Sequence, residues 1–229
     1  MTTVHFRSLA LAAVAALTFA ASGAAQDRAP GLLNTIEVRQ RVARAEPGDQ
    51  AQLSAHFNAL ADQYAAEAKR HISMSQSYVG NPSRNLAAGM SAHCRQLASL
   101  NTQSETIVRE LAAYHAKLAA GTQATPPKGG ARFQAGAGAP EPTEKELSAF
   151  AAKASTPAEH RGLDEYFRTL AKRYTAEANE HVALAQAYRG TRIAQAAVHH
   201  DRLAGLSRDA AREATAAADM HKQLAGIGR

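Results

Sequence analysis

The sequence predicts an all-α protein in which two tandem helical hairpins, each with a short leading helix, pack as a four-helix bundle. Three observations indicate this fold. The 229 residues are rich in Ala, the strongest helix former, with 5% aromatic residues and no Trp. Long stretches place apolar residues at alternating steps of four and three, the spacing of a buried helical seam. The second half of the chain also repeats the pattern of the first half.

The first 25 residues are typical of a secretory signal peptide. Arg7 supplies a positive charge, residues 9–21 form an apolar stretch too short to span a bilayer, and residues 22–25 offer small side chains for cleavage before Gln26. No later segment is apolar enough to cross a membrane. We therefore expect an exported, soluble protein that is periplasmic or secreted.

Charge and cysteine content narrow the classes of partner. The net charge of +6 becomes +5 (6 − 1) when Arg7 is removed with residues 1–25, which hold no Asp or Glu. In an exported chain with few aromatics and charges spread along helices, this positive charge does not favour nucleic acid as a partner. It predicts at most a weak attraction to anionic envelope surfaces.

The single Cys94 cannot form an internal disulfide. We expect it to be buried, with metal ligation or pairing with another chain as alternatives. The sequence does not indicate an oligomeric state.

The first predicted hairpin occupies residues 34–121. Asn34, followed by Glu37, is a capping signal for a short helix that ends near residue 45. Pro47 suits the first position of a long helix over 47–79. A return helix follows over 84–120, and Gly121 closes it. Its predicted seam consists of Leu86, Met90, His93, Leu97, Leu100, Ser104, Ile107, Leu111, Tyr114 and Leu118.

The second predicted hairpin occupies residues 143–226, after a Gly-, Pro- and Ala-rich stretch over 122–142 that predicts a flexible linker. Capping boxes at Thr143 and Thr156 open a short helix and a long helix over 157–189, and a return helix follows over 192–225. Aligning 46–80 with 156–190 gives 13 identities in 35 positions, and aligning 93–120 with 199–226 gives 8 in 28. These matches indicate an internal duplication.

Both copies place a Glu and a His one helical turn apart within the apolar seam: Glu67 with His71, and Glu177 with His181. When each hairpin is folded about its turn, His71 faces His93 and His181 faces His199. If the two turns lie at the same end, the four histidines share one core layer, with Glu67 and Glu177 one layer below. The linker could span ~70 Å when extended, so an inverted arrangement remains open.

This layer predicts a transition-metal site. Imidazole and carboxylate groups projecting inward from facing helices suit such ions, with Cu or Zn expected, and the function would be metal storage, buffering or sensing. The predicted ligands are His71, His93, His181 and His199, together with Glu67 and Glu177 as ligands or as hydrogen-bond acceptors behind them.

An alternative interpretation is that the Glu and His residues form only a hydrogen-bond network that fixes the register of the helices. The chain would then be a non-enzymatic structural, stress or interaction protein of the cell envelope. No residue pattern resembles an activated nucleophile, so catalysis is not favoured. We read two further histidines, His115 and His221, as surface ion-pair partners of Asp49 and Glu159.

One pattern carries a resemblance. Glu67-Ala68 followed by His71, then Tyr78, then the segment 90–94 (Met-Ser-Ala-His-Cys) resembles a set of uncharacterised exported bacterial helical proteins that have no assigned activity. The similarity spans each hairpin. It implies an exported helical bundle and implies no particular chemistry.

Overall fold

The computed structural model describes residues 31–81, 84–121 and 143–227. The predicted signal peptide over 1–25 and the predicted linker over 122–142 lie outside these ranges. Within them the chain forms six helices and no strand, which confirms the all-α prediction. None of the described helices is long and apolar enough to cross a membrane.

The helices follow the predicted order. They are α1 (Thr35–Arg44), α2 (Pro47–Val79), α3 (Arg84–Gly121), α4 (Glu144–Lys153), α5 (Pro157–Tyr188) and α6 (Gln195–Ile227). The three predicted capping boxes are present, because the side chains of Asn34, Thr143 and Thr156 each accept a hydrogen bond from the third helical amide. Local sequence signals therefore determine where α1, α4 and α5 begin.

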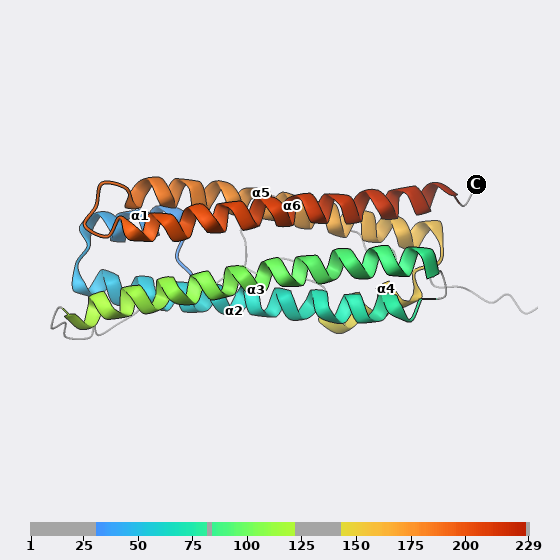
Figure 1. Cartoon of the computed structure of the whole chain (residues 1–229), viewed down its shortest axis with the longest axis horizontal. Coiled ribbons are helices and arrows are strands. Elements are labelled where there is room, and N and C mark those ends of the chain that lie inside the picture. The colour runs from blue at the N-terminus through green and yellow to red at the C-terminus, as the bar shows by residue number, and fades with distance from the viewer. Residues whose placement is uncertain (1–30, 82–83, 122–142, 228–229) are drawn as a thin grey trace, which may run out of the picture.

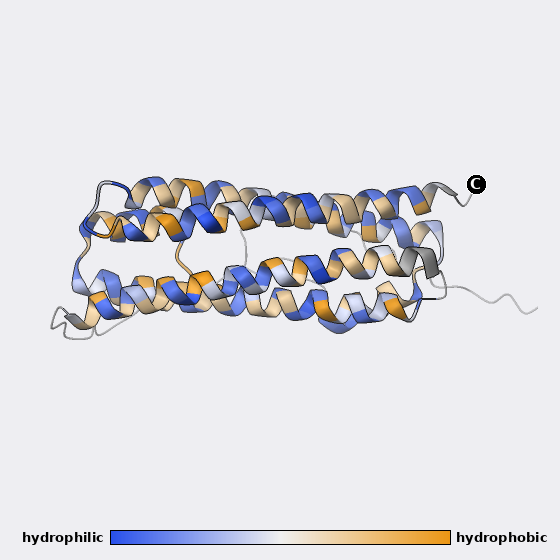
Figure 2. Ribbon diagram, viewed as in Figure 1, coloured by the Kyte–Doolittle hydropathy of each residue, from blue (hydrophilic) through white to orange (hydrophobic). Residues whose placement is uncertain are grey.

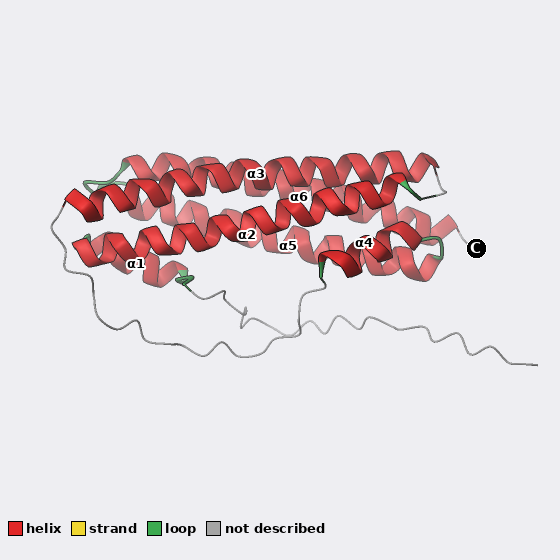
Figure 3. Ribbon diagram, turned by 90° about the horizontal axis from the view of Figure 1, so that it is seen from below, coloured by secondary structure: helices red, strands yellow, loops and turns green. Residues whose placement is uncertain are grey.

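The four long helices form two hairpins packed side by side. Helix α2 packs along α3 and α5 packs along α6, while α3 and α6 are the long helices that pack most closely between the hairpins (Figure 1). The two short helices lie on one side of the bundle, towards opposite ends (Figure 3). Each short helix reaches the other hairpin: α1 packs against α5 as well as α2, and α4 packs against α2.

The two hairpin turns lie at opposite ends of the bundle (Figure 1). Accordingly, Tyr78 at the end of α2 contacts His221 near the end of α6, with 2.9 Å between its hydroxyl and Nε2. At the other end, Tyr188 contacts His115, with 3.0 Å between the same atoms. The bundle thus adopts the inverted arrangement. The condition under which His71, His93, His181 and His199 would share one layer is not met.

The buried faces of α3 and α6 also include residues one position after those that a four–three spacing selects. Cys94 and His200 are fully buried, whereas the side chains of His93 and His199 keep about a fifth of their surface exposed. A core-facing helix buries about three positions in seven, so adjacent pairs such as Leu97 and Ala98 are both buried. A strict four–three seam selects one residue of each pair and therefore leaves out the other.

Apolar and hydrophilic stretches alternate along every long helix, as expected for amphipathic helices that each bury one face (Figure 2). The inward face of α6 is made largely of small side chains, including Ala210, Ala214 and Ala217. Such a core gains its stability from many close contacts of small area.

Candidate functional site

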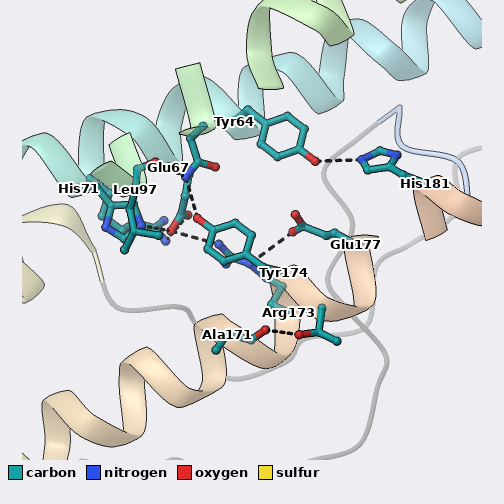
Figure 4. A network of polar contacts seen from close by, with 12 residues as sticks. Tyr64, Glu67, His71, Leu97, Ala171, Arg173, Tyr174, Glu177 and His181 are labelled. Atoms are coloured by element: carbon teal, nitrogen blue, oxygen red, sulfur yellow. Dashed lines mark hydrogen bonds and ion pairs between the residues drawn. The ribbon is translucent and has the colours of Figure 1, made fainter. Parts of the chain in front are cut away.

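The middle of the bundle carries a charged cluster centred on Glu67 of α2. Glu67 is 7% exposed, and its carboxylate forms ion pairs with cations on both hairpins (Figure 4). Arg70 Nη1 lies 2.9 Å from Oε2, and Arg173 Nη2, from α5, lies 3.1 Å from Oε1. His71 Nε2 is 3.2 Å from Oε1, one turn along the helix, as the spacing predicts.

Arg173 connects the two predicted carboxylate ligands. Besides Glu67, it approaches Glu177 one turn further along α5, with 3.6 Å between Nε and Oε1 (Figure 4). The guanidinium group thus lies between two carboxylates. Sequence reasoning missed Arg173 because the equivalent position of the first copy is Gln63, so the duplication does not single out this residue. Its spacing of four residues from Glu177 was the available signal.

The two carboxylates differ in protonation. Burial favours the neutral form of Glu67, but Arg173, then His71 and Arg70, outweigh it and hold its pKa well below the usual range. Burial raises the pKa of Glu177 to about 7, since the repulsion from Glu67 and Glu180 offsets the attraction of Arg173. The cluster therefore contains one carboxylate whose ionised form is stabilised and one whose ionised form is disfavoured by its surroundings.

His181 takes part in a different network from His71. Its Nε2 lies 3.2 Å from the Tyr64 hydroxyl of the other hairpin (Figure 4), and its Nδ1 lies 3.3 Å from His200 Nδ1. Burial lowers the pKa of His181 to about 4, with a further contribution from His56, and burial also lowers the pKa of His200. Both imidazoles are therefore neutral at pH 7.

His93 and His199, the remaining predicted ligands, each pair with a carboxylate across the contact between α3 and α6. His93 Nδ1 lies 2.5 Å from Glu213 Oε1, and His199 Nδ1 lies 3.6 Å from Glu110 Oε2. The six predicted ligands are thus divided among several local contacts: Glu67 with His71, Glu177 with Arg173, His181 with Tyr64 and His200, and the pairs that His93 and His199 form with carboxylates.

The interpretation of His115 and His221 as surface residues was wrong, because both side chains are fully buried. Their expected partners are engaged elsewhere: Asp49 pairs with Arg44 at 2.6 Å, and Glu159 accepts hydrogen bonds at the start of α5. A strict four–three seam selects Tyr114 and Met220 and leaves out the adjacent His115 and His221, although the buried face includes them. Their recurrence at the same position in both copies was the signal for a core role.

The side chains that could ligate a metal do not converge at one point. Among the described residues, no three or more His, Cys, Asp or Glu side chains gather closely enough to hold a metal ion. Cys94 is buried, and burial, with Glu213 nearby, raises the pKa of its thiol to about 12, so it is protonated at neutral pH. The predicted four-histidine layer is therefore not assembled, and metal binding itself stays a prediction.

No family model, curated protein or solved structure matches this chain.

Proposed function

We propose that the chain is a non-enzymatic protein of the cell envelope, with a structural or interaction role, whose buried polar side chains specify how its two hairpins dock. One observation supports this proposal most strongly: polar groups on one hairpin find their partners on the other. Tyr64 contacts His181, Glu67 contacts Arg173, and His93 contacts Glu213.

Burying a polar or charged group costs free energy unless it is paired. Apolar contacts alone discriminate weakly between alternative registers of an Ala-rich bundle. A carboxylate such as Glu67 selects one register, since sliding α2 along α5 would separate it from Arg173 and leave a buried charge. The cluster thereby gives the bundle a unique arrangement, as single polar seam residues do in coiled coils.

Export is part of the same proposal. It rests on the signal-peptide pattern of residues 1–25 and on the resemblance to exported helical proteins. A rigid bundle about 50 Å long, the length of a 33-residue helix, suits a spacer or a scaffold between partners in the envelope.

Metal binding is a second candidate, favoured by one specific contact. The two Nδ1 atoms of His181 and His200 lie 3.3 Å apart. Two imidazole nitrogens bound to one tetrahedral ion at about 2.05 Å are separated by about the same distance. This pair supplies two ligands only, and it involves His200 in place of the predicted His199.

The test measures the metal content and stability of the mature chain, purified without chelator or His-tag. We expect a metal-free protein whose thermal midpoint does not change on addition of EDTA, Zn or Cu. The His71→Ala/His181→Ala variant should be less stable, because it removes one buried partner from Glu67 and one from Tyr64. Near-stoichiometric metal that disappears in this variant would contradict the structural role and support the second candidate.

A double-mutant cycle on Tyr64→Phe and His181→Leu provides the positive evidence. If the contact joins the hairpins, the two changes should be non-additive by about 1 kcal/mol. Tyr174→Phe serves as the matched control with His181→Leu, since the Tyr174 hydroxyl accepts from Asn101 at 2.7 Å and does not contact His181. Additive effects in both cycles would count against a docking role for the pair.

A further inference from the structure

Each end of the bundle is joined by one fully buried histidine. At one end, His115 of α3 lies 3.0 Å from the Tyr188 hydroxyl through Nε2 and 2.7 Å from Gln50 Oε1 through Nδ1. Tyr188 is the last residue of α5, next to the turn of the other hairpin, whereas Gln50 belongs to the same hairpin as His115. The imidazole therefore connects the open end of one hairpin to the turn of the other.

The opposite end has the equivalent arrangement. His221 of α6 lies 2.9 Å from the Tyr78 hydroxyl through Nε2 and 3.2 Å from His160 Nδ1 through its own Nδ1. Tyr78 lies in the last turn of helix α2, next to the turn of the other hairpin. We call these two contacts, His115 with Tyr188 and His221 with Tyr78, the end junctions.

In each end junction, a neutral imidazole can form hydrogen bonds through both of its ring nitrogens. At His115, Nδ1–H donates to Gln50 Oε1, which leaves Nε2 to accept from the Tyr188 hydroxyl. At the other junction, the two facing Nδ1 atoms of His160 and His221 share one proton, because two facing N–H groups 3.2 Å apart would repel. Protonation thus removes an acceptor at one end and creates facing donors at the other.

The surroundings of the two histidines do not compensate a positive charge. His115 faces Gln50, Phe57 and His56 from α2, Tyr188 from α5 and His200 from α6. His221 faces His160 and Phe167 from α5, Tyr78 from α2 and His93 from α3. These groups are aromatic rings, an amide, hydroxyls and other bases, and none of them is a carboxylate.

The pKa values follow from this environment. Burial, with a contribution from His56, lowers the pKa of His115 to about 4. Burial, then His160 and His93, lowers the pKa of His221 to about 3. An unfolded histidine titrates near 6.5, so stability present above that pH is lost as the pH falls from 6.5 towards 4 and 3.

We propose that the end junctions make the bundle acid-sensitive: protonation of His115 and His221 breaks the contacts to Tyr188 and Tyr78 and separates the two hairpins. The proposal does not depend on whether the Glu67 cluster or His181 binds a metal. It assigns a conformational response to the two end junctions, whose four residues are not among the predicted metal ligands.

The test follows the separation of one end junction in the full mature chain. A fluorescent donor and acceptor are placed at Val79→Cys and Lys222→Cys, the exposed neighbours of Tyr78 and His221, in a Cys94→Ala background. We expect high transfer efficiency at pH 7.5 that falls with a midpoint between about pH 6 and pH 4. Unchanged transfer down to pH 3 would overturn the proposal.

The variant His115→Gln/His221→Gln keeps hydrogen-bonding capacity without titrating. Its midpoint should move down by about one pH unit. His93→Gln/His199→Gln is the matched control, since these histidines pair with carboxylates at the half-buried surface and should not move the midpoint downwards. Identical midpoints in the His115/His221 variant and the unsubstituted chain would overturn the proposal.

If the double glutamine variant does not fold, the chain with native histidines decides the question. The slope of its unfolding free energy against pH between 6.5 and 4 gives the net number of protons taken up on unfolding. The two end junctions predict an uptake of about two protons or more. A slope near zero would overturn the proposal.

Discussion

Glu67 and Glu177 show how two residues at equivalent positions of the predicted copies acquire opposite electrostatic roles. Glu67 is surrounded by Arg70, Arg173 and His71, so its ionised form is stabilised by folding. Glu177 has only the longer contact to Arg173 and lies near the charge of Glu67, so folding favours its neutral form. The same residue type therefore stabilises the bundle at one position and destabilises it at the other.

The variant Glu177→Gln should stabilise the protein at alkaline pH. The folded pKa of Glu177, about 7, lies above its ordinary value of 4.5, so ionisation costs stability as the pH rises through this range. At pH 8 we expect the free energy of unfolding to increase by about 1–2 kcal/mol, less than the full shift implies because the side chain is 27% exposed. At pH 4 the difference should vanish. Urea unfolding at both pH values measures it, and a loss of stability at pH 8 would contradict this account.

The matched variant Glu67→Gln should have the opposite sign. It removes the anion shared by Arg70 and Arg173 and should cost about 2–4 kcal/mol at pH 7. Because the folded pKa of Glu67 is depressed, this contribution is complete above about 4.5 and is lost as the pH falls below that value. The same urea experiments at pH 7 and at lower pH check it; a neutral effect at pH 7 would argue against a buried ion network.

At the residue scale, spacing predicted part of the cluster. The contact between Glu67 and His71 follows from their position one turn apart on the same helix face. The contact between Tyr64 and His181 could not be predicted, because it joins residues 117 positions apart and depends on how the hairpins dock. Residue identity predicted which side chains would be unusual, whereas the docking determined their partners.

At the scale of elements, α4 illustrates how a short helix is held. Its capping box at Thr143 defines its start, and Asn81 at the turn of the first hairpin holds its end. The Asn81 amide donates to the carbonyl oxygens of Ala154 at 3.1 Å and of Ala151 at 3.4 Å. Both carbonyl groups lie at the C-terminal end of α4, where the last carbonyls of a helix lack intrahelical partners. A ten-residue helix of this kind depends on such tertiary contacts.

We expect Asn81→Ala to loosen α4 with little effect on the long helices. Losing the two buried hydrogen bonds should cost about 1–2 kcal/mol. Hydrogen exchange should accelerate over residues 144–153 while α5 and α6 retain their protection. Thr156→Ala is a useful comparison, since it removes a cap from α5 and should cost about 1 kcal/mol without selectively exposing α4. Equal exchange in α4 of the Asn81 variant and the unsubstituted chain would contradict this role.

The sequence predicted the helices well because their signals are local. Capping residues, Pro at first helical positions and Gly at the ends depend on a few neighbouring residues. The side of α3 and of α6 that faces the core was less predictable. Cys94 and His200 lie in the core where His93 and His199 were expected. Since adjacent positions are both apolar along much of α3, the centre of the buried stripe is set by the partners it packs against.

At the scale of the whole molecule, the decisive feature is the inverted docking of the hairpins. Each hairpin can be folded from its own sequence, but the periodicity of its seam is the same whichever way the second hairpin points. The predicted linker over 122–142 is long enough to allow both directions. The direction is favoured in the structure by specific pairs, Tyr78 with His221 and Tyr188 with His115, which join each turn to the opposite open end.

The measurement that tests this account most directly is the distance between the two turns. Spin labels at Val79→Cys and Arg192→Cys, both exposed, in a Cys94→Ala background report it by pulsed electron resonance. Inverted docking predicts a separation of about 50 Å, the length of a 33-residue helix. A separation below about 20 Å would place both turns at one end, restore the common layer of His71, His93, His181 and His199, and contradict the account.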